Sequence, residues 1–307
     1  MKRVPNVTKW PFWLAFVCAI AAAPGTVWAQ SPDRMERLSK QPGWSAGPTI
    51  GSLGTKAIVT VPEGYMFLDA DATKRMLEQN HNITDGSELG AVLRLQGDDY
   101  WFAVFEYSDE GHVDDTDRDS IDAAALMTSM KEGNRLGNEE RRQRGWKAVN
   151  LAGWHKQPYY DTATNNLTWA TRLTSEEGGS PTINHSVRLL GRTGVMSVQL
   201  VADFDTIESS TAEFNQMLGG FTFNVGQKYA EFRKGDKLAG YGLAALIGGG
   251  VAATAVKTGF LKKFWKFLMM GFVALIGALK KLFGKVTGRG EESSTGNSGV
   301  PPLPTQQ

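Results

Sequence analysis

The segment Leu238–Val256, with the sequence LAGYGLAALIGGGVAATAV, contains nineteen residues and no charged side chain. A helix rises about 1.5 Å per residue, so this segment would reach about 28 Å, close to the roughly 30 Å hydrocarbon core of a bilayer. A helix also satisfies its own backbone polar groups, which lipid cannot do. The segment therefore predicts a transmembrane helix between a polar chain and a short tail. The alternative is a buried, Gly/Ala-rich helix in a soluble core.

Small side chains in this segment predict a contact face. Ala245, Gly249 and Ala253 recur every four residues and would lie along one side of the helix. Small residues let two membrane helices approach closely. We therefore expect self-association, or contact with a partner helix, through these three positions.

A basic segment and a second apolar run follow the predicted span. Lys257–Lys266 carries four lysines, and Phe267–Phe283 is apolar apart from two lysines. A basic segment beside a span tends to stay in the cytoplasm and attracts anionic lipid headgroups. The uncharged part, Phe267–Leu279, reaches only about 20 Å as a helix, which favours a helix in the membrane interface over a second span. Residues 284–307 are polar and rich in Gly, Ser and Pro, and predict a disordered tail.

Residues 1–29 have the organisation of a secretory signal peptide. Lys2, Arg3 and Lys9 form a positive segment before the apolar stretch Phe12–Ala23, and Val27-Trp28-Ala29 offers a cleavage site. The alternative is an uncleaved anchor. Export together with the later span predicts a membrane protein whose main domain is extracytoplasmic; in a bacterium this means the inner membrane and the periplasm.

Residues 31–236 make up the predicted exported domain. They contain 30 Asp plus Glu and 21 Lys plus Arg, a net charge of −9, although the whole chain has a formal charge of +1. This balance argues against nucleic-acid binding, because phosphate contacts need clustered Lys and Arg. The only cysteine, Cys18, lies in the signal, so we expect no disulfide and no thiolate metal site.

Short apolar segments predict an α+β fold with a mostly antiparallel sheet and flanking helices. The expected strands are Ala57–Val61, Tyr65–Leu68, Gly90–Leu95, Tyr100–Tyr107, Ala148–Trp154, Leu167–Leu173, Ile183–Leu190, Val195–Ala202 and Phe221–Phe223. The expected helices are Asp71–Gln79, Ile121–Arg144 and Asp203–Leu218. Both faces of Tyr100–Tyr107 are apolar, so this strand should be covered on both sides. The arrangement is similar to the sandwich of the PsbP-type extrinsic proteins of photosystems.

Local composition predicts several further details. Pro32–Pro48 is a polar lead-in, and Pro158–Asp161 is a turn-rich connection between two strands. Asp69 or Asp71 is expected to cap the first helix. The helix Ile121–Arg144 should turn four side chains toward the core, and its end, Asn138–Arg144, should be solvated. The four side chains are those of Ile121, Ala125, Met127 and Met130.

An acidic loop, Asp109–Asp122, contains a weak metal-site candidate. Asp115, Asp117 and Asp119 alternate as in a calcium loop. Ser120 stands where an EF-hand needs Gly, and Leu126 where it needs a bidentate Glu, so a solvated acidic turn that caps the next helix is the simpler interpretation.

The polar residues that could support catalysis are few. The weak candidates are His155 or His185 as a base and Asp161 as its orienting partner, with Tyr159, Tyr160, Asn184 and Arg192 nearby in the sequence. The alternative is that Tyr160 and Asp161 stabilise a turn. No motif points to a cofactor, and the His spacing matches no known metal motif.

Several segments together resemble one family, and they occur in order over about residues 50–285. These are Gly64–Ala70 (GYMFLDA), Trp101–Tyr107 (WFAVFEY), Asp109–Gly111, Asn138–Arg142 (NEERR), Gly153–Trp154, Pro158–Asp161 (PYYD), Leu190–Arg192, Lys228–Phe232 (KYAEF) and Asp236–Leu246 (DKLAGYGLAAL). They are similar to the bacterial membrane-anchored proteins of the domain-of-unknown-function 2167 family. The resemblance implies an exported domain with a C-terminal anchor, and brings no activity, cofactor or catalytic residue.

Two functional classes follow. The first is a non-enzymatic envelope protein whose exported domain binds a partner or ligand, or acts as a scaffold, while the tail holds it on the inner membrane. The second is a membrane-tethered hydrolase that acts on an envelope substrate. The lack of a recognisable triad, metal set or cofactor loop favours the first class.

Overall fold

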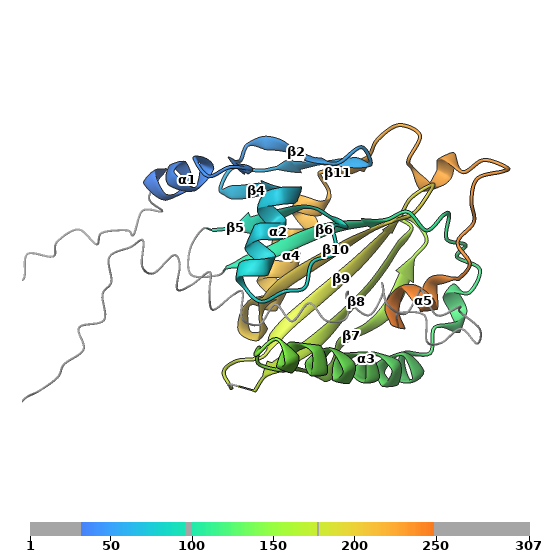
Figure 1. The fold of residues 1–307 in the computed structure, drawn as a ribbon. Helices are drawn as coiled ribbons and strands as arrows, with labels where there is room; N and C mark the ends of the chain where they lie inside the picture. The colour runs from blue at the N-terminus through green and yellow to red at the C-terminus, as the bar shows by residue number, and fades with distance from the viewer. Residues whose placement is uncertain (1–31, 96–99, 177, 249–307) are drawn as a thin grey trace, which may run out of the picture.

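The computed structural model describes residues 32–95, 100–176 and 178–248. Its centre is an eight-stranded sheet in which every neighbouring pair is antiparallel (Figure 1). In spatial order the strands are β1 (Trp44–Ala46), β4 (Tyr65–Asp69), β5 (Glu88–Arg94), β6 (Trp101–Ser108), β10 (Val195–Asp203), β9 (Thr182–Leu190), β8 (Asn166–Ser175) and β7 (Val149–Asp161). The α+β class and the antiparallel sheet predicted from the sequence are confirmed.

One face of this sheet is covered by a second, smaller sheet and a helix. The small sheet has the order β11 (Phe221–Phe223), β3 (Ala57–Val61) and β2 (Thr49–Leu53), and the helix is α4 (Ile207–Leu218). Trp101, Ala103 and Phe105 of β6 pack into the core between the layers, together with Phe214 of α4. Alternate positions of one strand thus supply this face, as its period of two requires.

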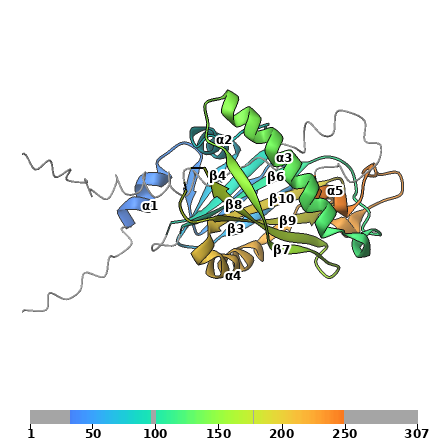
Figure 2. The same ribbon diagram turned by 90° about the horizontal axis from the view of Figure 1, so that it is seen from below.

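The opposite face carries three helices. Figure 2 shows α3 (Ala123–Gln143) and α4 on opposite sides of the large sheet. At one end, α2 (Ala70–Gln79) packs on Phe102 and Val104 of β6; at the other, α3 and α5 (Leu243–Gly248) pack on β8 and β7. The predicted two-sided burial of β6 is confirmed.

Aspartate carboxylates cap the N-termini of two of these helices. The Asp69 carboxylate accepts a hydrogen bond from the Ala72 backbone N–H of α2 at 2.8 Å. The Asp122 carboxylate accepts bonds from the backbone N–H groups of Ala124 and Ala125 of α3, both at 3.0 Å. Each satisfies backbone donors that have no partner within the helix, so the acidic loop does cap the helix that follows it.

Four sequence expectations need correction. The lead-in contains α1 (Pro32–Ser39) and β1, and β2 follows it directly. Pro158–Asp161 is the end of β7 and pairs with β8, so the turn lies later, at 162–165. In α3 the core position is Leu126, and Ala125 is exposed. These errors share a cause: local composition does not report which segment a strand or helix meets in the fold.

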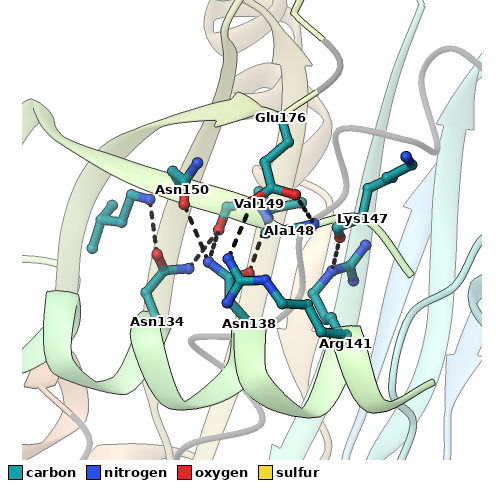
Figure 3. Close-up of polar contacts among 10 residues, drawn as sticks. Asn134, Asn138, Arg141, Lys147, Ala148, Val149, Asn150 and Glu176 are labelled. Atoms are coloured by element: carbon teal, nitrogen blue, oxygen red, sulfur yellow. Dashed lines mark hydrogen bonds and ion pairs between the residues drawn. The ribbon is translucent and has the colours of Figure 1, made fainter. Parts of the chain in front are cut away.

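The end of α3 is the fourth correction, because part of the expected solvated charge run is buried. Asn138 and Arg141 are each 3% exposed. Figure 3 shows both side chains reaching from α3 to the backbone of β7 and the residues before it. Asn138 both donates to the Val149 carbonyl oxygen at 3.0 Å and accepts from the Val149 N–H at 2.9 Å. Arg141 donates to the carbonyl oxygen of Lys147 at 2.7 Å.

These contacts close an edge of the large sheet, since β7 is its last strand. Asn134, one helical turn earlier, donates to the same Val149 oxygen at 2.8 Å and accepts from the Leu151 N–H at 3.0 Å (Figure 3). Two amides four residues apart on a helix therefore replace a missing neighbouring strand. Further along, β7 is interrupted by three register shifts, which discourage pairing with another chain.

The apolar segment Leu238–Val256 is described as far as Gly248. Within it, Leu243, Leu246 and Ile247 of α5 are at most 3% exposed and lie in the core beneath α3. Up to this point the segment follows the buried-helix alternative stated above, because it packs in the core of the domain. No helix in the described ranges is long and apolar enough to cross a membrane. The predicted signal (1–29), the rest of the span, the basic segment, the second apolar run and the tail lie outside the described residues.

Candidate ligand-binding groove

A groove of about 660 Å³ opens on the large sheet beside α4 and β11. Its floor is formed by β8 and β9, one wall by the end of α4 and β11, and the other by the end of β7 and the turn after it. The short 3₁₀ helix η3 (Tyr229–Glu231) stands at one end. A volume of this size lies within the usual range for ligand sites, roughly 300–1,000 Å³.

The lining combines apolar surface with uncharged polar groups. The apolar side chains are those of Val187, Leu189, Leu190, Leu218, Phe221, Phe223 and Ala230. The neutral polar side chains are those of Thr164, Asn165, Asn166, Thr168, Asn215 and Thr222. Tyr159 and Tyr229 add aromatic rings, whereas Asp161 and Lys228 are the charged residues of the lining. Such a lining suits an uncharged molecule that has an apolar face and hydrogen-bonding groups.

His185 is the most distinctive group of the floor. Its side chain comes from the middle of β9, is 5% exposed, and has no hydrogen-bond partner at Nε2. The ring lies edge-on to Phe214, with 5.8 Å between centroids. Burial, with smaller contributions from the charges of Lys156 and His155, lowers the pKa of His185 to about 4. The imidazole is therefore neutral at pH 7 and can offer one hydrogen bond to a bound molecule.

The carboxylate of Asp161, the predicted orienting partner, accepts its hydrogen bonds from residues of the turn after β7. One carboxylate oxygen accepts from the Ala163 N–H at 2.9 Å and the other from the Thr164 hydroxyl at 2.8 Å. These bonds, that from the Thr164 hydroxyl first, lower the pKa of Asp161. Tyr160 donates to Asn165 at 3.4 Å in the same turn. The alternative that Tyr160 and Asp161 stabilise a turn agrees with this geometry, although the turn itself lies further along the chain than expected.

The remaining members of the predicted catalytic set do not converge on the groove. His155 lies 3.5 Å from Glu208 and edge-on to Phe204. Asn184 is adjacent to His185 in β9 and so faces the opposite side of the sheet, where it lines a different cavity. Arg192 forms a two-bond ion pair with Asp236, at 2.7 and 2.8 Å. Only His185, Asp161 and Tyr159 of the set share the groove.

The three aspartates of the possible calcium loop have other partners. Asp117 accepts bonds from the backbone N–H groups of Leu243 at 2.9 Å and Ala244 at 3.3 Å, and so caps α5. Asp115 and Asp119 lie 3.5 and 3.9 Å from Arg118. Across the described ranges, no group of three or more His, Cys, Asp or Glu side chains is placed to hold a metal ion.

A second, much smaller cavity of about 30 Å³ lies between α5 and the sheet, enough for about one or two water molecules. Its polar lining includes Arg188, which is 5% exposed, stacks on the Trp169 ring at 4.8 Å, and has no hydrogen-bond partner at Nη1. Burial raises the pKa of Glu106, two strands away in the same polar row, well above its usual range. Ala245, from the predicted small-residue face, lies in α5 and is 5% exposed; Gly249 and Ala253 lie outside the described residues.

Sequence reasoning could find only one wall and part of the floor of the groove. Asn215, Thr222, Phe223 and Lys228 come from segments with no polar motif. They reach the site because α4 and β11 fold back over β8 and β9. The spacing of residues along the sequence does not predict this long-range packing.

Comparison with solved structures finds distant similarity. The solution structure of cyanobacterial PsbP from Synechocystis sp. PCC 6803 is 12% identical, with a TM-score of 0.33, and the alignment covers 59% of this chain and 97% of that one. The Ran-binding protein Mog1p of Saccharomyces cerevisiae is 10% identical, with a TM-score of 0.28 and coverages of 58% and 93%. No curated protein matches the sequence. A family model described as "Protein of unknown function (DUF2167)" matches residues 46–280, which is most of the chain, and the protein therefore belongs to the DUF2167 family.

Proposed function

We propose that this protein is a membrane-anchored envelope protein whose main domain, outside the cytoplasm, binds an uncharged ligand in the groove between β8, β9, α4 and β11. The observation that carries the proposal is the groove itself. It has the volume of a ligand site, and its lining combines apolar side chains with amide and hydroxyl groups and the neutral His185 of the floor. A short oligosaccharide has the matching chemistry, because each sugar ring presents an apolar face and several hydroxyl groups.

The anchor is proposed to lie beyond Gly248. Leu243, Leu246 and Ile247 are committed to the core, so a span over all of Leu238–Val256 would have to remove them from it. The apolar sequence that follows, Gly249–Val256 and Phe267–Phe283, remains for contact with lipid. The signal-like sequence of residues 1–29 supports export of the domain.

Binding is tested with the N-acetylglucosamine trimer as probe, titrated into the full chain and followed by saturation-transfer NMR. We expect millimolar or tighter binding that is lost in Asn215→Trp and Thr222→Trp, because both positions are exposed and line the groove. Gln216→Trp is the matched control, since this exposed neighbour in α4 does not line the groove. No binding, or binding that survives both groove substitutions, would exclude an oligosaccharide of this kind.

The same experiment separates binding from hydrolysis. Asp161 and His185 share the groove, which is the observation in favour of a hydrolase. Mass spectrometry of the probe after prolonged incubation should show it intact. Cleavage that disappears in His185→Phe would instead favour the hydrolase.

The anchor is tested by extraction of membranes with carbonate. Each Arg near the centre of a span costs about 2.5–3.5 kcal/mol. We expect the pair Met270→Arg and Leu275→Arg to release the protein, and the pair Ala252→Arg and Ala255→Arg to do so only if the first apolar run also enters the bilayer. A protein that is extracted without any substitution would contradict the anchor.

A further inference from the structure

An exposed apolar group marks the 224–238 loop, which joins β11 to the segment leading to α5. Val225 is 91% exposed, Leu238 60% and Phe232 38%. Figure 1 shows this loop, in orange, projecting beyond one end of the large sheet. Exposed apolar side chains are ordinary when they are scattered, but three within one short loop indicate a contact surface.

The loop is held in a defined conformation, so these side chains are presented and not merely unpacked. Arg192 pairs with Asp236 and also donates to the Gly226 carbonyl oxygen at 3.4 Å, which joins the two ends of the loop. The His112 ring stacks between Tyr229 and Phe232, at 4.3 and 4.2 Å. His112 also exchanges backbone hydrogen bonds with the loop's end, to the Lys237 oxygen and from the Ala239 N–H, both at 2.8 Å.

The charge of the loop is opposite to that of the domain. Its basic side chains, Lys228, Arg233, Lys234 and Lys237, are all exposed. Its two acidic side chains are used internally. Glu231 accepts from the Lys228 backbone N–H at 2.8 Å, and Asp236 binds Arg192 and the Arg233 backbone N–H. Residues 31–236 as a whole carry a net charge of −9, whereas the loop itself has four basic and two acidic side chains. The acidic segment Asp109–Asp122 packs beside the loop through His112 and Val113.

We propose that the 224–238 loop rests on an anionic lipid surface, with Val225, Phe232 and Leu238 entering the boundary between headgroups and acyl chains. Apolar side chains flanked by Lys and Arg are the combination that binds such interfaces, because the basic groups are attracted to anionic headgroups. This inference rests on the proposed membrane anchor and adds which side of the domain faces the bilayer.

The path of the chain agrees with that orientation. Asp117 holds the first turn of α5, and four residues, 239–242, separate the end of the loop from the start of α5. α5 has six residues, so Gly248 lies within about 9 Å of Leu243 along the helix. The described part of the chain therefore ends, at Gly248, close to the cationic loop.

Depth measurement by spin labelling tests the surface in the full chain. Cys18 is the only cysteine, so Cys18→Ser followed by Val225→Cys or Leu238→Cys gives single labelling sites. Ile50→Cys is the matched control, because Ile50 is also apolar and is 66% exposed, but lies in β2 of the small sheet. The proteins are reconstituted in vesicles of phosphatidylcholine with phosphatidylglycerol, and collisions with oxygen and with a nickel chelate are compared.

We expect the oxygen-to-nickel collision ratio at positions 225 and 238 to exceed that at position 50 several-fold. Arg233→Glu with Lys234→Glu should lower it toward the control value, whereas Lys40→Glu with Lys74→Glu should not. Labels as accessible to nickel as position 50, in a protein that still floats with the vesicles, would contradict the surface and leave the anchor standing. Failure to float would contradict both. Label immobilisation that grows with protein concentration in water would assign the surface to a second copy of the chain instead.

Discussion

Two helices cover the same face of the large sheet, and they are attached by different chemistry. Beneath α2 the contact is mainly apolar, from Met66, Leu68, Leu93, Phe102 and Val104 of the strands to Met76 and Leu77 of the helix, with the buried Thr73 hydroxyl donating to the Leu68 carbonyl oxygen. Beneath α5 the strands present the polar side chains of Asn184, Ser186, Arg188 and Gln199 beside the apolar ones of Leu151, Trp169 and Leu173, with a cavity of about 30 Å³ between them and Leu246 and Ile247. One end of the face is therefore built for stability, and the other for a contact that opens at lower cost.

The two contacts differ in how exposure to water changes their free energy. Apolar surface gains about 25 cal/mol per Å² when it leaves water, without any demand on geometry. A buried guanidinium needs partners, and Nη1 of Arg188 has none, so exposure of this end returns hydrogen bonds that the folded state lacks. α5 should therefore separate from the sheet well before α2 does.

The largest expected effect is at the α2 end. Phe102 is fully buried, so Phe102→Ala should lower the free energy of unfolding by about 3–5 kcal/mol, measured by urea denaturation of the full chain. Phe204→Ala, at a position that is 39% exposed, is the control and should cost much less. Equal losses of unfolding free energy in Phe102→Ala and Phe204→Ala would contradict the conclusion that the α2 end contributes most to stability.

Leu246→Ala should lower the free energy of unfolding by less than Phe102→Ala does. The expected loss is about 2 kcal/mol, at the low end of the range for a buried leucine. Because α5 is attached over a cavity, the loss should be local. Hydrogen exchange should speed up in α5 and in the start of α3, while the amides of β6 keep their protection. A uniform loss of protection across the sheet would show that the two ends unfold together.

Asn138→Ala tests the polar attachment of α3. The substitution leaves the buried Val149 N–H without its partner, at a cost of about 1–3 kcal/mol. Asn134 still covers the Val149 oxygen, so the lower part of that range is expected. Gln143→Ala, at an exposed position of the same helix, should stay within about 0.5 kcal/mol of the parent protein. A neutral Asn138→Ala would mean that water replaces the amide at this sheet edge.

The smallest effect is a change in the slope of stability with pH. Burial raises the pKa of Glu106, so the folded state binds this proton more readily than the unfolded state. Stability should therefore fall as pH rises from the unfolded pKa, about 4.3, toward the higher folded value. Glu106→Gln should remove that fall. The free energy of unfolding of the variant, relative to that of the parent protein, should therefore be higher at pH 8 than at pH 4. Glu63→Gln, at an exposed position, is the control, and an unchanged slope in Glu106→Gln would assign the fall to another group.

A feature of the fold could be predicted from the sequence where it depends only on residues that are neighbours in the chain. The two faces of β6 were predictable because a strand alternates its side chains whatever lies above them. Asn138 and Arg141 were not, since a run of polar residues looks the same whether water or a strand edge faces it. The composition of α5 satisfies lipid and a soluble core equally well, so only the fold shows that Leu243, Leu246 and Ile247 lie in the core.

The Arg192–Asp236 ion pair also has a mechanical consequence. A chain held in a membrane is pulled at its anchored end, and tension entering at Gly248 would reach α5 first, then the His112–Leu238 bridge and the ion pair. α5 would peel away one turn at a time, whereas the ion pair and the backbone bonds beside it would bear load together. Lys228 and Tyr229 of the groove precede that point in the chain, so the groove would keep its shape while the tail is under tension.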